Sequence, residues 1–292
     1  MASILVTGAS RGIGRATCIS LGRAGHRVFA TMRDPAKTDL SAIAAAESLP
    51  ILVSAMDVDS DDSVRRGVGD ILAQHGPLDA LVNNAGIERR GSVEELSLDE
   101  FRAVMETNYF GVIRCIKAVL PAMRTRGRGC IVNVTSVAGR ISVSPLGPYS
   151  ATKFALEALS EALAQEVKAL GIRVAIVQPG IIDTDMANAI ADAADRSIYP
   201  HSDRLAGLFT ASLKTPTGPE IVGDTIRDII ESGSSQLRYP VGPDAAPFLA
   251  WREAMTDEQW VDWGAADDAS WYAAVERDFG LDARKAESPS KR

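Results

Sequence analysis

The sequence predicts an α/β fold: one doubly wound parallel sheet of about seven strands with helices on both faces. Two observations along residues 1–245 favour this class. Short apolar runs alternate with longer helical patterns, as in repeated strand–helix–strand units. The short runs are almost continuously Val, Ile and Leu, which is typical of strands that are covered on both faces.

The short runs are expected to be strands and the longer patterns helices. The predicted strands cover residues 4–7, 27–31, 51–54, 80–83, 130–135, 173–178 and 237–240. The predicted helices lie near residues 12–24, 39–48, 60–74, 98–123, 149–170 and 219–232. Residues 183–215 are helical by composition but are not closely followed by a strand, so they depart from the alternation.

The composition argues against several classes of function. The chain has 292 residues, 46% of them hydrophobic, and a formal net charge of −7. No basic nucleic-acid footprint is present, and no apolar run is long enough for a membrane span or a signal-peptide core. Three cysteines without a CxxC pair or a histidine at ligand spacing predict neither disulfides nor a metal site. We therefore expect a cytoplasmic protein that binds no nucleic acid and no metal.

A glycine-rich turn, Thr7-Gly8-Ala9-Ser10-Arg11-Gly12-Ile13-Gly14, joins the first predicted strand to the first predicted helix. Its three glycines permit a tight turn and close backbone approach, and the free amides of the following helix favour a phosphate. An ordinary strand–helix turn could have the same residues. The position directly after the first strand favours a Rossmann-type site for the pyrophosphate of a dinucleotide.

The end of the second predicted strand indicates which dinucleotide. An acidic residue there would bind a free ribose 2′-hydroxyl and repel a 2′-phosphate, but Met32 occupies this position and Arg33 follows it. Arg11 projects from the glycine turn, and two guanidinium groups can bracket a phosphate. We therefore predict NADP(H) over NAD(H). The alternative is that Arg33 is only a solvated charge at the end of a strand.

Tyr149 and Lys153 stand four residues apart on a predicted helix, so both side chains lie on one face. A phenol beside a cation and a dinucleotide can pass a proton while a hydride moves, which is the chemistry of carbonyl and alcohol redox reactions. Taken alone, Tyr149 could equally be an aromatic residue that packs a helix start on the sheet. A hydrolase is not expected, because no GxSxG elbow is present and His26, His75 and His201 are expected to be surface residues.

Further segments complete a pattern in which the chain resembles the short-chain dehydrogenase/reductase family over residues 3–242. The resemblance rests on TGxxxGxG at 7–14, Asp57-Val58, NNAG at 83–86, Asn108, Ser136, YxxxK at 149–153, and Pro179-Gly180 with Thr184. The segment Ala-Thr-Met-Arg-Asp at 30–34 is also similar to the branch that contains hydroxysteroid and retinol dehydrogenases. The resemblance implies a Rossmann-type oxidoreductase, usually a dimer or tetramer.

The resemblance assigns catalytic roles to Asn108, Ser136, Tyr149 and Lys153. Tyr149 would be the acid/base, and Ser136 would hold the substrate oxygen. Lys153 would bind the nicotinamide ribose and, with the oxidised nicotinamide, lower the pKa of the phenol from about 10. Asn108 would support a water that connects Lys153 to solvent. Taken singly, Ser136 could be structural, and Asn108 could satisfy backbone groups inside a helix.

The implied cofactor contacts lie at the carboxyl ends of the strands. Asp57 would accept from the adenine amino group, Asn83 would mainly tie strand ends together, and Thr184 would meet the nicotinamide carboxamide. The full expected set is Gly8, Ser10, Arg11, Gly12, Ile13, Gly14, Arg33, Asp57, Val58, Asn83, Ala85, Gly86, Tyr149, Lys153, Pro179, Gly180, Ile182 and Thr184.

An apolar substrate is expected, a ketone, aldehyde or the corresponding alcohol, because the segments after the fifth and sixth strands are rich in apolar residues. The expected lining is Val143, Pro145, Leu146, Ile181, Met186, Ile190, Leu205, Leu208 and Phe209. Two alternatives to an oxidoreductase are a non-catalytic dinucleotide sensor or scaffold and a nucleotide-sugar epimerase or dehydratase. The first would be expected to lack Tyr149 or Lys153, and the second generally has a different glycine spacing.

We expect residues 1–245 to form a single NADP(H)-binding and catalytic domain, with residues 183–215 as its substrate loop. Residues 246–292 would be a separate extension and tail, which holds all four tryptophans and ends in a frayed segment, 286–292. The sequence leaves open whether this extension covers the substrate mouth or packs on a neighbouring subunit.

Overall fold

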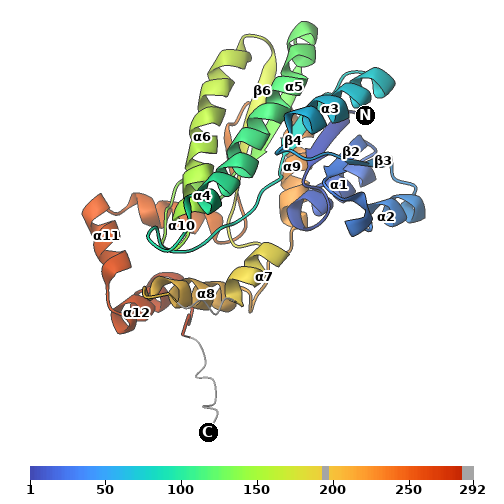
Figure 1. Cartoon of the computed structure of the whole chain (residues 1–292). Coiled ribbons are helices and arrows are strands. Elements are labelled where there is room, and N and C mark those ends of the chain that lie inside the picture. Colours follow the sequence, from blue (N-terminus) through green and yellow to red (C-terminus); the bar gives the residue numbers. More distant parts are fainter. Residues whose placement is uncertain (193–196, 285–292) are drawn as a thin grey trace.

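The computed structural model describes residues 1–192 and 197–284 of the chain (Figure 1). The expected frayed segment 286–292 lies outside the described residues. No helix in the described ranges combines the length and the apolar character that crossing a membrane requires.

The sheet is the predicted one: seven parallel strands in the order β3-β2-β1-β4-β5-β6-β7. The strands are β1 (Ser3–Thr7), β2 (Arg27–Met32), β3 (Ile51–Ala55), β4 (Ala80–Asn83), β5 (Gly129–Val134), β6 (Ile172–Pro179) and β7 (Arg238–Val241). The order reverses between β1 and β4, and loops leaving two adjacent strands in opposite directions open a crevice at their carboxyl ends. That crevice is where the glycine turn lies.

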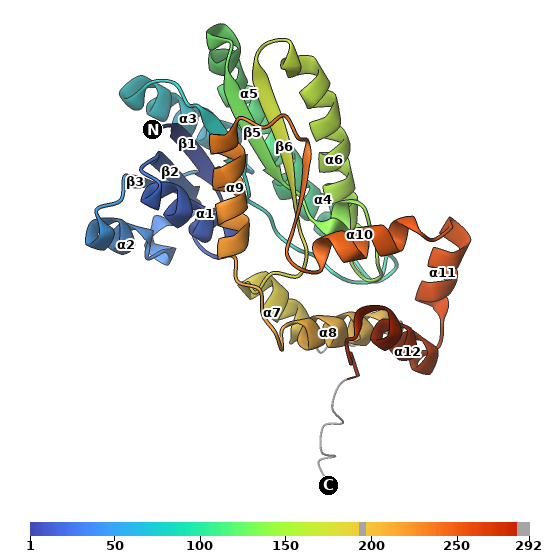
Figure 2. The same cartoon turned by 180° about the vertical axis from the view of Figure 1, so that it is seen from behind.

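Helices cover both faces of the sheet, as Figures 1 and 2 show from opposite sides. The helices are α1 (Gly12–Arg23), α2 (Leu40–Glu47), α3 (Asp61–His75), α4 (Leu98–Met105), α5 (Gly111–Arg126), α6 (Gly147–Lys168), α7 (Asp185–Ala191), α8 (His201–Ser212), α9 (Glu220–Ser232), α10 (Ala245–Glu253), α11 (Asp257–Ala265) and α12 (Asp268–Phe279). Short 3₁₀ turns occur at Pro35–Lys37 and Val137–Gly139.

Alternation along each strand divides the core into two layers. Ile4 and Val6 of β1 pack with α1, α2 and α9, whereas Leu5 packs with α3, α5 and α6. All three side chains are fully buried. A strand apolar at every position therefore serves both layers, which is the physical reason that the β-rich runs were almost continuously apolar.

One predicted helix differs from the structure. The pattern at 98–123 predicts a single helix, but a π-helix (Glu106–Phe110) separates α4 from α5. A π turn carries one extra residue, which is a local feature that apolar periodicity does not report. Its consequence is functional, because the π turn holds Asn108.

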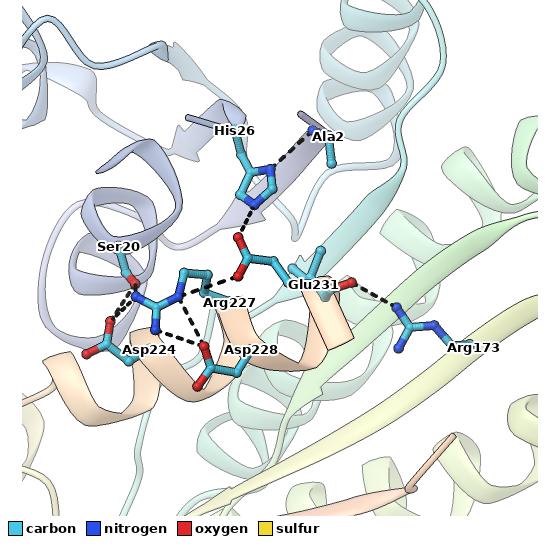
Figure 3. Close-up of polar contacts among 9 residues, drawn as sticks. Ala2, Ser20, His26, Arg173, Asp224, Arg227, Asp228 and Glu231 are labelled. Atoms are coloured by element: carbon cyan, nitrogen blue, oxygen red, sulfur yellow. Dashed lines mark hydrogen bonds and ion pairs between the residues drawn. The ribbon is translucent and has the colours of Figure 1, made fainter. Parts of the chain in front are cut away.

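The polar layer between α9, α1 and β2 corrects the expectation for His26 (Figure 3). His26 is 7% exposed. Its Nδ1 accepts from the Ala2 amide at 3.1 Å, so Nε2 carries the proton and donates to Glu231 at 2.9 Å. Glu231 belongs to α9, and a second residue of that helix, Asp224, accepts from Ser20 of α1 at 2.6 Å. His26 is thus a buried residue whose side chain joins α9 to the start of β2, and the expectation that it lies at the surface is wrong.

Candidate active site

The glycine turn forms a close-fitting cradle at the start of α1. A Cβ atom on Gly8, which has φ of +65°, would lie 2.6 Å from the Ala85 Cα atom, and one on Gly14 would lie 2.4 Å from the Gly8 carbonyl oxygen. No side chain caps α1, so its first amides are free to meet an anion. The residues present therefore fit the pyrophosphate of a dinucleotide.

Asn84 builds this cradle, and the sequence-based set of site residues omits it. The Asn84 side-chain amide donates to the carbonyl oxygens of Thr7 at 3.0 Å and Gly8 at 3.1 Å. The Thr7 hydroxyl in turn accepts from the Asn84 and Ala85 amides, each at 3.1 Å. The segment Asn83-Asn84-Ala85-Gly86 was the signal available in the sequence. That Asn84 would bond to Gly8, seventy-six positions earlier, cannot be inferred from spacing.

The end of β2 carries the residues expected to select the dinucleotide. Met32 and Arg33 both line the cavity, together with Asp57 and Asp59. Burial raises the pKa of the Asp59 carboxyl, and the charge of Arg33 opposes this rise. Arg11 also lines the cavity; its Nη1 donates to Asp185 of α7 at 3.1 Å, and both of these side chains are largely exposed. The bracketing of a phosphate by Arg11 and Arg33 stays a prediction.

Tyr149 and Lys153 lie one turn apart on α6 and face the end of β5. The Lys153 Nζ atom lies 5.5 Å from the centroid of the Tyr149 ring and donates to the Val134 carbonyl at 2.9 Å. The Ser136 side chain, just beyond β5, hydrogen-bonds to Tyr149. Three of the four predicted catalytic residues therefore converge at one place in the cavity wall.

The pKa of the Tyr149 phenol is raised by its surroundings in the protein. Burial is the main cause, the hydrogen bond to Ser136 opposes it, and the negative charge of Glu88 adds to it, so that the pKa is about 12. Burial also lowers the pKa of the Lys153 ammonium to about 8, and Glu157 opposes this decrease. The protein's own groups thus hold Tyr149 as a neutral phenol. The expected decrease in its pKa depends on a bound oxidised nicotinamide as well as on Lys153, and it stays a prediction.

Asn108 lies behind the cavity wall. It is fully buried in the π-helix, its Oδ1 accepts from the Ile87 amide at 2.8 Å, and its Nδ2 donates to the Ile87 carbonyl at 2.9 Å and to Thr152 at 3.0 Å. Thr152 precedes Lys153, so Asn108 joins the loop after β4 to the helix that carries the catalytic pair. Asn108 does satisfy backbone groups, but they are those of Ile87 in a loop rather than of a helix.

One cavity of about 380 Å³ contains most of the predicted cofactor and catalytic residues. The exceptions are Gly14, Asn83 and Asn108, which lie behind its wall. Asn83 donates to Asn133 of β5 at 2.8 Å, in line with its expected role of tying strand ends together. Gly12 lies close to Thr184 in the cavity, since a Cβ atom on Gly12 would lie 3.3 Å from Thr184 Cγ2.

The far part of the cavity is apolar. The expected lining residues are all present except Pro145, which is buried elsewhere in the same segment. Sequence reasoning missed the other half of this wall, which comes from the extension: Phe248, Trp251, Trp263 and Phe279. The extension therefore lines the apolar end of the cavity in the structure, as in the first of the two alternatives left by the sequence. Figure 2 shows α10, α11 and α12 of the extension together with α8.

Arg204 joins the extension to the substrate loop. This buried residue of α8 donates to Asp268 at 2.8 Å and to the Gly264 and Ala266 carbonyls at 3.2 and 2.7 Å. Trp271 and Val275 of α12 form a small core with residues of α8 and α11. At the other end, Asp244 accepts from the Ile181 amide at 2.7 Å and so fastens the start of α10 beside Gly180. We call α8, α11 and α12 the cap.

Comparison with known proteins supports the resemblance. The profile of the short chain dehydrogenase family matches residues 2–195. A 3-ketodihydrosphingosine reductase from Bacteroides thetaiotaomicron is 36% identical over 247 residues, which cover 82% of this chain and 87% of that protein. Retinol dehydrogenase 8 from Bos taurus is 36% identical over 263 residues, which cover 85% of this chain and 84% of that protein.

A solved structure agrees over most of the chain. The gluconate 5-dehydrogenase of Burkholderia cenocepacia, in complex with NADP and tartrate, has 28% identity and a TM-score of 0.69 and covers 80% of this chain and 89% of its own. Together with the parallel sheet, the glycine cradle and the Tyr149–Lys153 pair, these matches show that the chain belongs to the short chain dehydrogenases, a family of oxidoreductases.

Proposed function

We propose that the protein is an NADP(H)-dependent oxidoreductase that interconverts an apolar ketone or aldehyde and the corresponding alcohol. One observation carries this proposal: the Ser136, Tyr149 and Lys153 side chains meet where the glycine-lined part of the cavity joins its apolar part. A proton-transfer group at that junction can reach a substrate oxygen while the substrate's carbon lies against the cofactor end.

The residues proposed to hold the cofactor are those that line the glycine end. Gly8, Gly12 and the first amides of α1 would bind the pyrophosphate, and Asp57 with Val58 would meet the adenine. Ile182 and Thr184 would bind the nicotinamide end, and Lys153 its ribose. When bound, NADP(H) supplies or accepts the hydride.

Tyr149 is proposed as the acid/base. A phenol whose pKa is about 12 is protonated at neutral pH, which is the form needed to donate a proton to a carbonyl oxygen. Ser136 would donate to the same oxygen as negative charge develops on it. The Lys153 ammonium offers positive charge that favours the phenolate left after proton transfer. Asn108, through Thr152 and Ile87, would hold the backbone around Lys153 in place.

The preference for NADP(H) rests on charge. The residue at the end of β2 is Met32 rather than a carboxylate, so nothing at that position repels a 2′-phosphate, and Arg33 adds positive charge beside it. NADP in the gluconate 5-dehydrogenase complex supports the same choice. Steady-state kinetics with both cofactors tests it, and a larger kcat/KM with NAD(H) would overturn it.

The apolar substrate is proposed from the cavity wall. The cavity that Tyr149 lines is also lined by large apolar side chains, namely Trp251, Trp263, Phe279, Leu208 and Phe209. The names of two relatives, a ketodihydrosphingosine reductase and a retinol dehydrogenase, point to substrates with long apolar parts. A panel of ketones, aldehydes and alcohols of increasing chain length, followed by nicotinamide absorbance, tests the proposal. Turnover confined to sugars or to keto acids would overturn it.

We further propose a cytoplasmic homodimer or homotetramer, in which residues 1–245 bind the cofactor and residues 246–292 complete the substrate site. Deleting residues 246–292 separates the parts of this proposal. Loss of substrate affinity with retained NADPH binding is the expected result, because only the apolar end of the cavity loses its wall. Unchanged KM for an apolar substrate would show that the extension has no part in the site.

A further inference from the structure

Glu157 is a buried carboxylate one helical turn beyond Lys153. Its side chain is 5% exposed, and it lies on the same face of α6 as Lys153 because the two are four residues apart. Buried carboxylates are rare unless they are paired and hydrogen-bonded, so the contacts of Glu157 indicate what its charge does.

The contacts of Glu157 come from three neighbouring strands. Oε1 lies 2.8 Å from Thr135 Oγ1 and accepts from Gln178 of β6 at 3.0 Å, and Oε2 accepts from Arg238 of β7 at 2.9 Å. Thr135 directly follows Val134, whose carbonyl receives the Lys153 ammonium. The carboxylate therefore fixes the strand end that positions Lys153, from behind the cavity.

The turn that follows Ser136 packs on the same part of α6. A Cβ on Gly139 would lie 2.9 Å from Glu157 Cγ and 3.1 Å from the Lys153 carbonyl oxygen. There is no room between this turn and the helix for a larger side chain or a shifted backbone. Ser136, Lys153 and Glu157 therefore form one packed unit.

Without Lys153, the charged side chains around this unit would carry a net negative charge. Arg238 is shared by two carboxylates, Glu157 and the half-exposed Glu161. On the cavity side, Glu88 from the loop after β4 acts on Tyr149 and pairs with Arg90 at 4.0 Å, and Arg140 beyond Gly139 pairs with Glu253 of α10. These cavity-side pairs leave the Glu157–Arg238–Glu161 group, two carboxylates with one arginine, as the source of the excess negative charge. A net negative charge is thus left beside Lys153, and it favours the ammonium over the neutral amine.

We propose that Glu157 is a positioning residue of the active site, which holds Lys153 in its charged form and in its place at the end of β5. The role assigned to Lys153 rests on the proposed function, whereas the effect of Glu157 on Lys153 does not. The direction follows from the structure: burial lowers the pKa of Lys153 to about 8, and Glu157 raises it. Without the carboxylate, the ammonium would be lost at a lower pH.

The test is the pKa of Lys153, measured by NMR on protein with ¹³C-labelled lysine ε-carbons and assigned with Lys153→Met. Glu157→Gln keeps the shape of the side chain and one of its two acceptor oxygens but removes its charge. The pKa of Lys153 should fall by about one unit or more, because a close opposite charge typically shifts a pKa by that amount. Glu161→Gln is the matched control, since it removes an exposed carboxylate from the same arginine one turn further on, and it should leave the pKa nearly unchanged.

Arg238→Met extends the test, because it should shift the pKa of Lys153 in the opposite direction. Removing this cation leaves the Glu157 charge less compensated, so the pKa of Lys153 should rise. If Glu157→Gln does not fold, this variant alone decides, because a lowered or unchanged pKa in Arg238→Met would overturn the proposal.

The same variants should show the shift in cofactor binding. NADPH affinity, measured by fluorescence titration, should decline with rising pH at a midpoint about one unit lower in Glu157→Gln than in the wild type. Equal pKa values of Lys153 in the wild type and Glu157→Gln, or equal shifts in the two glutamine variants, would overturn the proposal. An inactive protein in which the pKa of Lys153 still shifts would instead contradict the proposed function.

Discussion

Replacing Gly14 with alanine is the sharpest test of the cradle. Gly14 lies in the first turn of α1 and is buried. In an ordinary helix interior, Gly→Ala stabilises a protein by about 0.5–1 kcal/mol. At Gly14 the added methyl group would lie 2.4 Å from the Gly8 carbonyl oxygen and 2.5 Å from Asn84 Nδ2. Neither atom can move without opening the turn, so overpacking should outweigh the helix gain and destabilise the protein by about 1–3 kcal/mol.

The matched control is Gly69→Ala in α3. Gly69 is also inside a helix, but nothing lies within 4 Å of its added Cβ atom. The control should gain about 0.5–1 kcal/mol, so the free energies of unfolding of the two variants should differ by roughly 2–4 kcal/mol. Urea denaturation measures this difference.

NADPH fluorescence should show at least about tenfold weaker binding for Gly14→Ala alone, which corresponds to about 1.4 kcal/mol. If Gly14→Ala were as stable as Gly69→Ala and bound NADPH normally, the close fit of the glycine turn to Asn84 would not exist.

Three further changes test other parts of the site. Tyr149→Phe should lower kcat by about 10²–10⁴-fold with NADPH binding retained, whereas Tyr239→Phe, which removes a buried hydroxyl without a hydrogen-bond partner, should be harmless; retained turnover in Tyr149→Phe would exclude the proton-donor role. Met32→Asp should decrease the ratio of kcat/KM for NADPH to that for NADH at least about tenfold, by repulsion of the 2′-phosphate, and an unchanged ratio would place the selecting contact elsewhere. Arg204→Met should raise KM for an apolar substrate with little change in NADPH affinity, because it removes the hydrogen bonds that join α8 to the Gly264 and Ala266 carbonyls. Arg277→Met, which removes an exposed ion pair, is its control, and equal effects of the two would refute a specific role for Arg204.

The catalytic pair could be predicted because its geometry is local. Tyr149 and Lys153 are four residues apart, and any helix brings them to one face, so their convergence needs no knowledge of the fold. The same holds for the glycine turn, since a strand, three glycines and a helix succeed one another within a short segment. Asn108 was predicted to be a site residue, but its surroundings were not predicted. The π turn that buries it packs against α4, α5 and α6, and these contacts depend on the tertiary structure.

Other residues could not be predicted because their partners are distant in the chain. Asn84 acts on Gly8, Glu157 on Arg238, and Arg204 on Ala266, and no spacing rule joins these positions. His26 was expected at the surface, but α9 covers it. The ion pair of Arg11 with Asp185 is another contact between distant positions that spacing does not indicate.

By itself, the sequence determined the class of fold, a parallel sheet of about seven strands, and the short spacing that brings the phenol and the ammonium to one face of a helix. These depend on periodicity and short spacings, which the chain carries locally. Only the tertiary structure decided the electrostatic state of that pair and the wall of the substrate site. Burial raises the pKa of Tyr149, and the tryptophans of the extension close the apolar end of the cavity. Both results have the same cause. Segments that lie far apart in the sequence pack together and exclude water from the site.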